Sequence, residues 1–159
     1  MQKITTFLWF NDNAEEAMSL YTSIFPDSKL LSVSRYGDAG PGPKGQVMTA
    51  NFLLHGHEFI VLNGGPQFTF TPAVSFVVNC EDQAEVDHYW DKLLAGGGLP
   101  NQCGWLQDKF GLSWQITPRR LTDLMNEGGE TAKRAFEAMM EMRKIDIAKL
   151  DAAVAGVKA

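Results

Sequence analysis

Along the first part of the chain, the spacing of hydrophobic and polar residues is typical first of a strand, then of a helix, then of further strands. Residues 4–10 are rich in β-branched and aromatic side chains, which predicts a strand. The next apolar positions recur at helical spacing and predict one buried helix face. These positions are Ala14, Ala17, Met18, Tyr21, Ile24 and Phe25. Three further strands are predicted at residues 29–36, 46–54 and 57–63, the last two joined in a hairpin at His55-Gly56. The order is βαβββ.

The second part of the chain repeats this order. Residues 74–79 predict a strand, and a second apolar stripe predicts a helix that ends at residues 96–98, three glycines. The stripe contains Val86, Tyr89, Trp90, Leu93 and Leu94. A hairpin follows, with its turn at residues 108–111 and its second strand stopped by Pro118. Few residues separate Gly98 from Cys103, so the second strand of this copy is expected to be short or missing.

An internal βαβββ repeat predicts an α+β fold in which two modules form a cup-shaped mixed sheet. Neither module can bury both its sheet and its helix stripe alone. We therefore expect residues 1–118 to act as one domain, with modules at 1–66 and 73–118. Residues 119–159 are predicted to form a helical extension that packs on the sheet or on a partner subunit.

Polar residues at helix starts predict where the helices begin. Asn13 with Glu16, and Asp82 with Glu85, have the spacing of capping boxes. In the extension we expect a short turn at residues 121–125, a helix capped by Thr131 and a last helix from Asp146.

Composition limits the classes of partner. The chain has 159 residues, 45% hydrophobic and 21% charged, with a formal net charge of −5. Without a dense basic cluster, nucleic acid and anionic membranes are not expected partners. No apolar run approaches the roughly 20 residues that span a bilayer, and we expect no signal peptide. The two cysteines form no Cys-x-x-Cys pair, so we expect reduced thiols and a cytoplasmic protein.

Several polar residues invite a functional interpretation beside a structural one. His55 and His57 suggest metal ligands, but we favour a solvated hairpin tip, because two imidazoles without an acidic third ligand bind a metal weakly. His88 is a helix-surface residue or a base. Cys80 and Cys103 are structural cysteines or nucleophiles, and no base stands at recognisable spacing to activate either.

Two further candidates lie in turns or loops. Asp108 is a turn cap or a general base. Arg35, Tyr36 and the loop of residues 37–45 form an exposed loop or a lid over an anionic ligand.

Several motifs resemble those of one family along nearly the whole chain. They are Phe7-Leu8-Trp9-Phe10, Asn13-Ala14-Glu15-Glu16-Ala17, Tyr21, Ile24-Phe25-Pro26, Leu62-Asn63-Gly64-Gly65-Pro66, Val86-Asp87-His88-Tyr89-Trp90, Cys103-Gly104-Trp105, the stretch 108–118 and Arg143-Lys144-Ile145-Asp146-Ile147. The chain resembles the PhnB-like proteins, labelled 3-demethylubiquinone-9 3-methyltransferase, of the vicinal oxygen chelate (glyoxalase/bleomycin resistance) superfamily. The resemblance implies a cup of two modules, usually as a homodimer.

Metalloenzymes of this superfamily bind a divalent ion on the concave face, and the resemblance places the four ligand positions in this chain. They fall at Thr5, within residues 60–62, at or next to Ser75, and at Gln115. Neutral and apolar side chains bind divalent metals poorly, so we expect no metal there. We expect no other cofactor, because neither residues 64–65 nor 96–98 stand between a strand and a helix N-terminus, as a nucleotide or adenosylmethionine site requires.

The register implied by the resemblance predicts a ligand pocket with aromatic and hydrogen-bonding side chains. Its residues are Thr5, Phe7, Trp9, Ser75, Val77, Ser113 and Gln115. The same aromatics would alternatively fill the cup as core. We interpret the chain as a small-molecule binding protein without the usual metal. There are two alternatives. One is an enzyme with a displaced or non-metal site, whose catalytic residues the sequence does not identify. The other is an interaction protein that binds through its tail helices.

Overall fold

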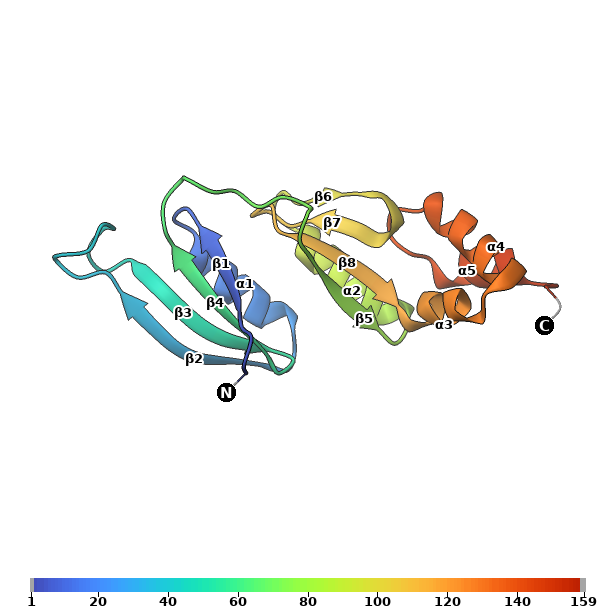
Figure 1. The fold of residues 1–159 in the computed structure, drawn as a ribbon, viewed down its shortest axis with the longest axis horizontal. Helices are drawn as coiled ribbons and strands as arrows, with labels where there is room; N and C mark the ends of the chain where they lie inside the picture. Colours follow the sequence, from blue (N-terminus) through green and yellow to red (C-terminus); the bar gives the residue numbers. More distant parts are fainter. Residues whose placement is uncertain (1, 158–159) are drawn as a thin grey trace. The chain divides into compact units, whose positions relative to one another are not determined.

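A computed structural model describes residues 2–157, and the chain divides into two compact units between Thr69 and Phe70 (Figure 1). Each unit contains one four-stranded sheet with a helix packed against it. Within the described residues no helix combines the length and the apolar character needed to cross a membrane.

The first unit has the predicted βαβββ order. Its elements are β1 (Thr6–Phe10), α1 (Ala14–Ile24), β2 (Ser28–Arg35), β3 (Val47–Leu54) and β4 (His57–Asn63). The strands lie in the order β1-β4-β3-β2; β1 is parallel to β4 and the other neighbours are antiparallel. The β3–β4 hairpin turns at His55-Gly56, as predicted from the sequence.

One face of this sheet is buried and α1 packs on β3 and β4. The buried strand residues include Leu8, Phe10, Ala50, Phe52, Leu54, Phe59 and Val61. Each large side chain buried here contributes about 1.5–3 kcal/mol relative to exposure. Since strand side chains alternate, the residues between them lie on the opposite, open face.

Asn63, at the end of β4, joins three segments of the first unit. Its Oδ1 accepts a hydrogen bond from the Ala14 amide at 2.8 Å, and its Nδ2 donates to the Val47 carbonyl at 2.9 Å. The Tyr36 hydroxyl donates to its backbone carbonyl. Asn13 stands at the N-cap position of α1, as predicted, but the predicted side-chain cap is wrong: its side chain makes no cap hydrogen bond, and the buried Asn63 accepts from the first helix amide instead.

The second unit repeats the order with a shortened second strand. Its elements are β5 (Ser75–Cys80), α2 (Gln83–Leu94), β6 (Leu99–Pro100), the 3-10 turn η1 (Gln102–Gly104), β7 (Trp105–Gln107) and β8 (Ser113–Pro118). The strand order is β5-β8-β7-β6, with β5 parallel to β8. The two-residue β6 confirms the expected shortening. Asp82 caps α2 as predicted, accepting from the Glu85 amide at 2.9 Å.

The turn before β8 is built around one buried carboxylate. Asp108 is 3% exposed and accepts hydrogen bonds from the amides of Phe110 and Leu112 and from Trp114 Nε1, at 2.9–3.0 Å. Gly111 has a φ of 88°, which a residue with a Cβ rarely adopts. The prediction that Asp108 caps this turn is confirmed.

The extension forms three helices that belong to the second unit: α3 (Arg119–Glu127), α4 (Gly129–Met140) and α5 (Ile147–Val154). Two boundaries differ from the prediction. The short turn at 121–125 is a nine-residue helix, and α4 begins at Gly129, before Thr131. These helices and the segment between α4 and α5 share a small core of Leu121, Leu124, Ala135, Met142, Ile145 and Leu150.

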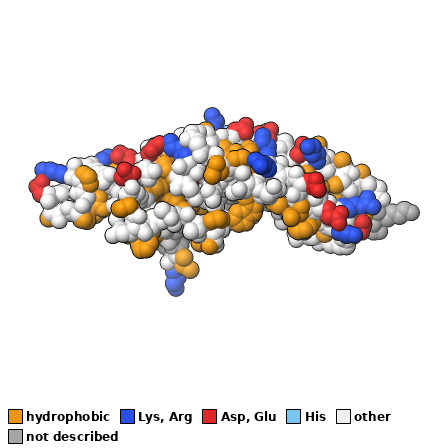
Figure 2. Space-filling model, turned by 90° about the horizontal axis from the view of Figure 1, so that it is seen from above, with side chains coloured by type: hydrophobic (Ala, Val, Ile, Leu, Met, Phe, Trp, Pro, Cys, Tyr) orange, Lys and Arg blue, Asp and Glu red, His pale blue; other side chains and the backbone are white. Residues whose placement is uncertain are grey.

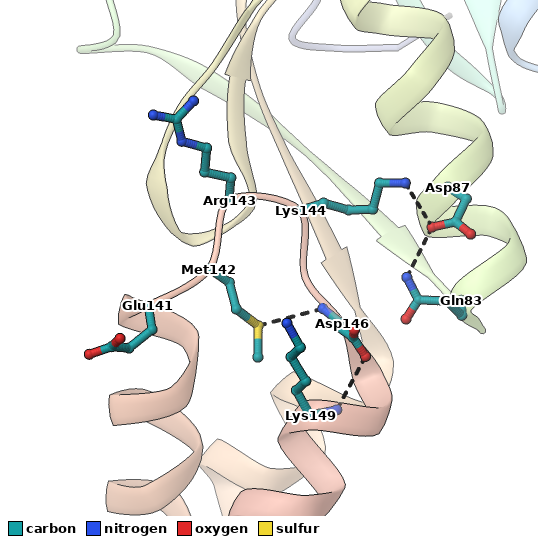
Figure 3. A pocket seen from close by; sticks show the side chains of 8 residues that line it. All are labelled: Gln83, Asp87, Glu141, Met142, Arg143, Lys144, Asp146 and Lys149. Atoms are coloured by element: carbon teal, nitrogen blue, oxygen red, sulfur yellow. Dashed lines mark hydrogen bonds and ion pairs between the residues drawn. The ribbon is translucent and has the colours of Figure 1, made fainter.

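The segment of residues 142–147 returns to the βαβββ part of the second unit (Figure 3). The amides of Cys103 and Gly104 donate to the carbonyls of Met142 and Arg143 at 2.8 and 2.7 Å. On the α2 side, Gln83 donates to the Ile145 carbonyl and accepts from the Ile147 amide. The segment is thus held at both the Cys103-Gly104-Trp105 turn and the start of α2.

Candidate functional site

The open face of the first sheet is aromatic at β1. Phe7 is 53% exposed and Trp9 is half-buried; their parallel partners on β4 are Ile60 and Leu62. Thr5, half-buried, lies just before β1. The structure therefore brings Phe7 and Trp9 onto one surface, with Thr5 at the start of their strand.

Trp9 is held in a fixed position on this face. Its Nε1 donates to the Gly65 carbonyl at 2.9 Å, and its ring meets Phe68 edge-on, with centroids 5.0 Å apart. The indole also covers Gly64: a Cβ there would lie 2.4 Å from the Trp9 ring. The Gly64-Gly65 pair therefore makes room for Trp9 and accepts its hydrogen bond.

The open face of the second sheet carries polar groups. Gln115 on β8 donates through Nε2 to the Ser75 hydroxyl on β5 at 2.9 Å. Both side chains are half-buried, and Val77, paired with Gln115 in register, is 49% exposed. Ser75, Val77 and Gln115 therefore form one continuous surface of neutral side chains.

Ser113 extends this surface but is enclosed. It pairs with Ser75 and with Gln107, and only 1% of its surface is exposed. Its Oγ is the one buried side-chain nitrogen or oxygen without a hydrogen-bond partner in the described part of the chain. A buried hydroxyl without a partner is costly, so this position is one where a partner would be stabilising.

The seven predicted pocket residues thus form two groups. Thr5, Phe7 and Trp9 belong to the first unit, and Ser75, Val77, Ser113 and Gln115 to the second. Within each unit the predicted residues lie on the same sheet or beside it.

Sequence reasoning missed two members of the second open face. Trp105 pairs with Gln115, and Gln107 pairs with Ser113. Both are half-buried. The two-residue period of the strand before the Asp108 turn is the signal that identifies them.

The histidines lie where the structural interpretation placed them. His55 and His57 are exposed at the β3–β4 hairpin tip, and His57 Nε2 lies 3.0 Å from the Thr6 hydroxyl. His88 is exposed on α2, with its ring edge-on to Tyr89. In residues 2–157 no cluster of three or more His, Cys, Asp or Glu side chains has a metal-binding arrangement.

Both cysteines are free thiols in structural surroundings. Burial, with the nearby carboxylates of Glu85 and Asp82, raises the pKa of Cys80 to about 12. Cys103 is half-buried, and its Sγ lies 3.6 Å from the Met140 sulfur. The high pKa of Cys80 leaves it without a nucleophilic thiolate at neutral pH.

The loop of residues 37–45 rests on the core of the first unit. Tyr36 is buried, and both Gly40 and Gly42 lie against its ring. Arg35 forms an ion pair with Glu15 at 3.0 Å, and its Nη1 donates to the Gly45 carbonyl. These contacts give Arg35 and Tyr36 structural partners in place of an anionic ligand.

A polar pocket of about 440 Å³ lies beneath the 142–147 segment (Figure 3). It is lined by Gln83, Asp87, Glu141, Met142, Arg143, Lys144, Asp146 and Lys149. The lining carries three basic and three acidic side chains, so it has no excess of either charge. Lys144 points towards Asp87, 3.2 Å away, and hydrogen bonds from Gln83 and then Lys144 lower the pKa of Asp87. Gln83, Asp87 and Lys144 thereby hold the C-terminal extension against α2.

Charged side chains of both signs are interspersed on the face drawn in Figure 2. Exposed ion pairs of the chain include Arg119 with Glu81, Arg120 with Asp151 and Arg134 with Glu130. The described residues on this face show no broad basic area of the kind that binds nucleic acid.

Comparison with known proteins gives a consistent family and fold. The sequence model of the 3-demethylubiquinone-9 3-methyltransferase family matches residues 2–117. A PhnB protein from Bacillus cereus is 46% identical; the match covers 74% of this chain and 99% of that protein, with a TM-score of 0.68. A search of curated proteins finds no match.

Two more distant structures share the fold. A protein from Pseudomonas aeruginosa is 23% identical, with 74% of this chain and 98% of that protein covered and a TM-score of 0.61. The fosfomycin resistance protein FosX from Listeria monocytogenes, determined with Mn(II) and sulfate, is 12% identical, with 80% and 98% covered and a TM-score of 0.54. The repeated βαβββ units therefore have the glyoxalase/bleomycin resistance fold.

Proposed function

The chain belongs to the 3-demethylubiquinone-9 3-methyltransferase family of PhnB-like proteins, and we propose that it binds a small aromatic molecule without a divalent metal ion. Each open sheet face is a candidate ligand surface by itself. The first unit has an apolar aromatic surface at Phe7 and Trp9, and the second unit has hydrogen-bonding groups at Ser75 and Gln115.

One observation carries this proposal: the Gln115 amide and the Ser75 hydroxyl hydrogen-bond to each other. The family resemblance places two metal-ligand positions at these residues, and the others at Thr5 and within residues 60–62. Divalent first-row metals prefer imidazole, carboxylate or thiolate ligands. Hydroxyl, amide and aliphatic side chains do not fit such an ion, whereas they suit an organic ligand.

The aromatic residues support ligand binding because they are exposed and held in place. Large apolar side chains with half their surface exposed are common at binding surfaces when they cluster. Trp9 is fixed by the Gly65 carbonyl and by Phe68, so its ring offers a preorganised surface. A flat ring stacked there would bury apolar area at little entropic cost.

The positions of the two glycine runs support a role that does not use adenosylmethionine. Gly64-Gly65 follow β4, and residues 96–98 follow α2. Nucleotide-type cofactors bind where a glycine-rich turn connects a strand to a helix N-terminus. Neither glycine run has that position.

The experiment is a screen of aromatic compounds by tryptophan fluorescence, with and without EDTA. We expect binding that is indifferent to the chelator. Phe7→Ala should weaken it about five- to thirtyfold, the loss expected from about 1–2 kcal/mol of apolar contact. The matched control is Phe136→Ala on α4, which is 46% exposed and should leave affinity unchanged. Binding abolished by EDTA and restored by a metal would overturn the proposal in favour of a metalloenzyme.

We also propose that the chain forms a homodimer, as the family resemblance implies. Sedimentation equilibrium tests this independently of ligand binding: twice the 17.6 kDa mass of the chain is expected, and a monomer at high concentration would contradict it.

A further inference from the structure

The C-terminal extension lies beyond the region that this chain shares with its family. The family model ends at residue 117, before α3. The match with the Bacillus cereus protein covers 99% of that protein but 74% of this chain, so the rest of this chain has no counterpart there. A contact made by the extension would therefore come in addition to whatever residues 2–117 bind.

The surface of α4 is part buried and part open. Ala135 is fully buried, and Met139 packs against the small core of the extension. On the outer side, Phe136 is 46% exposed and Met140 is 50% exposed. The two side chains are neighbours on the helix because they stand four positions apart. Met140 also contacts the Cys103 thiol, with its Sδ 3.6 Å from Sγ. The outer side of α4 thus presents two adjacent large apolar side chains to solvent.

Charged side chains extend this outer side in both directions along α4. Lys133 lies before Phe136, and Glu137 and Glu141 follow at the spacing of the same helix face. All three are exposed, and none forms a side-chain hydrogen bond or ion pair with another described residue. Glu141 points away from the other labelled side chains in Figure 3. The outer side of α4 therefore has an uncompensated positive charge at one end and two uncompensated negative charges towards the other.

From this pattern we propose that α4 binds the α4 helix of a second copy of this chain, in antiparallel orientation, about a twofold axis next to Phe136. With a rise of about 1.5 Å per residue, Lys133 then lies within about one helical turn of both Glu137 and Glu141 of the second copy. A parallel pair would place like charges opposite each other, which is unfavourable. Exposed charge pairs of this kind determine orientation and partner choice more than affinity.

The apolar side chains supply the attraction in this contact. Phe136 would pack beside Phe136 of the second copy, and Met140 against the aliphatic part of its Lys133. Since α4 has 12 residues, the helix pair buries less than the roughly 800 Å² per partner of a stable interface. We therefore expect a weak association, with a dissociation constant on the order of 10–100 µM. It does not rest on the homodimer proposed above, to which it would add a second contact.

Sedimentation equilibrium of the full chain between about 5 and 500 µM tests the inference against Phe136→Glu. At the highest concentration we expect the wild-type mass to be twice that of the variant, whatever oligomer the variant itself forms. Far-UV circular dichroism and urea denaturation check that the variant is folded. Equal masses for the two folded proteins would overturn the inference, and would leave both the proposed ligand binding and the proposed homodimer intact.

A charge exchange tests whether the second copy is recognised specifically. Lys133→Glu should weaken the association at least about tenfold, because the outer side of α4 becomes wholly acidic. Adding Glu137→Lys and Glu141→Lys restores opposite charges at the two ends and should restore the association. The control is Lys149→Glu, the same change at an exposed position of α5, which should associate like the wild type. A triple variant that stays dissociated, or a control that dissociates as Lys133→Glu does, would overturn the inference.

Discussion

The two βαβββ units begin their first helices by different means. In the second unit Asp82 caps α2 from the adjacent position in the chain. In the first unit the first backbone amide of α1, that of Ala14, donates to the side chain of Asn63, 49 residues further along the chain. The first unit thus relies on one buried amide at the end of β4. The second combines a local cap with the returning 142–147 segment, which Gln83 holds against α2.

The difference shows how one fold can be completed in two ways. In the first unit the chain continues from β4 into Gly64-Gly65, so Asn63 is free to join α1, β3 and Tyr36. In the second unit the chain continues from β8 into α3, and the extension supplies further contacts to α2. We therefore expect the units to respond differently to equivalent substitutions.

The largest effect is expected at the turn of the second unit. Asp108→Ala leaves the Trp114 indole and two backbone amides without their acceptor, and should reduce the free energy of unfolding by about 3–5 kcal/mol. Urea denaturation measures this loss. Asp108→Asn keeps an acceptor oxygen and should lose less. Asp38→Ala, an exposed aspartate in the first unit, should change stability by no more than about 0.5 kcal/mol. A loss below about 1 kcal/mol for Asp108→Ala would refute the structural role.

The second-largest loss of stability is expected at the start of the first helix in each unit. Asn63→Ala leaves the Ala14 amide and the Val47 carbonyl unpaired and should cost about 2–4 kcal/mol. Asp82→Ala in the second unit removes only a local cap and should cost about 1 kcal/mol. Asn13→Ala should be close to neutral, since its side chain makes no cap. Thermal and urea unfolding of the three variants give the order; Asn13→Ala as costly as Asn63→Ala would contradict it.

A smaller effect is expected where the extension meets α2. Gln83→Ala removes two hydrogen bonds to the 142–147 segment and should cost about 1–2 kcal/mol. Amide hydrogen exchange should increase in this segment, at Cys103 and at Gly104, and remain unchanged in the first unit. The pKa of Asp87 should also rise, because the Gln83 hydrogen bond is the main cause of its lowered value. Unchanged exchange in residues 142–147 would show that Gln83 does not hold the extension.

The smallest effect at neutral pH concerns Cys80. Its pKa is raised to about 12 in the folded chain from an ordinary value of 9.0, so its contribution to stability is complete below pH 9. Above that pH the unfolded state loses the proton first, and stability falls as the pH rises towards 12. Cys80→Ala should flatten this decline between pH 9 and 10.5 in urea titrations. An identical decline in the variant would assign it to other groups.

The element types could be predicted from the sequence because their signals are local. The helix stripes, the strand runs, the His55-Gly56 hairpin and the Asp108 turn each depend on neighbouring residues. The side-chain cap expected from Asn13 is not formed, and the first amide of α1, that of Ala14, donates instead to Asn63 on a distant strand. The Gln83 contact to Ile147 spans 64 positions and has no periodic pattern.

The candidate site could be predicted only in part. Strand parity within each unit places Phe7 with Trp9, and Ser75 with Gln115, on common faces. Trp105 and Gln107 follow the same parity and were overlooked. The hydrogen bond between Gln115 and Ser75, and the unpaired hydroxyl of Ser113, depend on side-chain positions that no sequence pattern specifies.

Metal analysis tests most directly whether the site at Ser75 and Gln115 is free of a metal ion. The protein is purified without chelator, dialysed against manganese, nickel or zinc, and measured by inductively coupled plasma mass spectrometry. We predict far less than one ion per chain, with no change in the Gln115→Leu variant. One tightly bound ion per chain that is lost in Gln115→Leu would contradict a metal-free site.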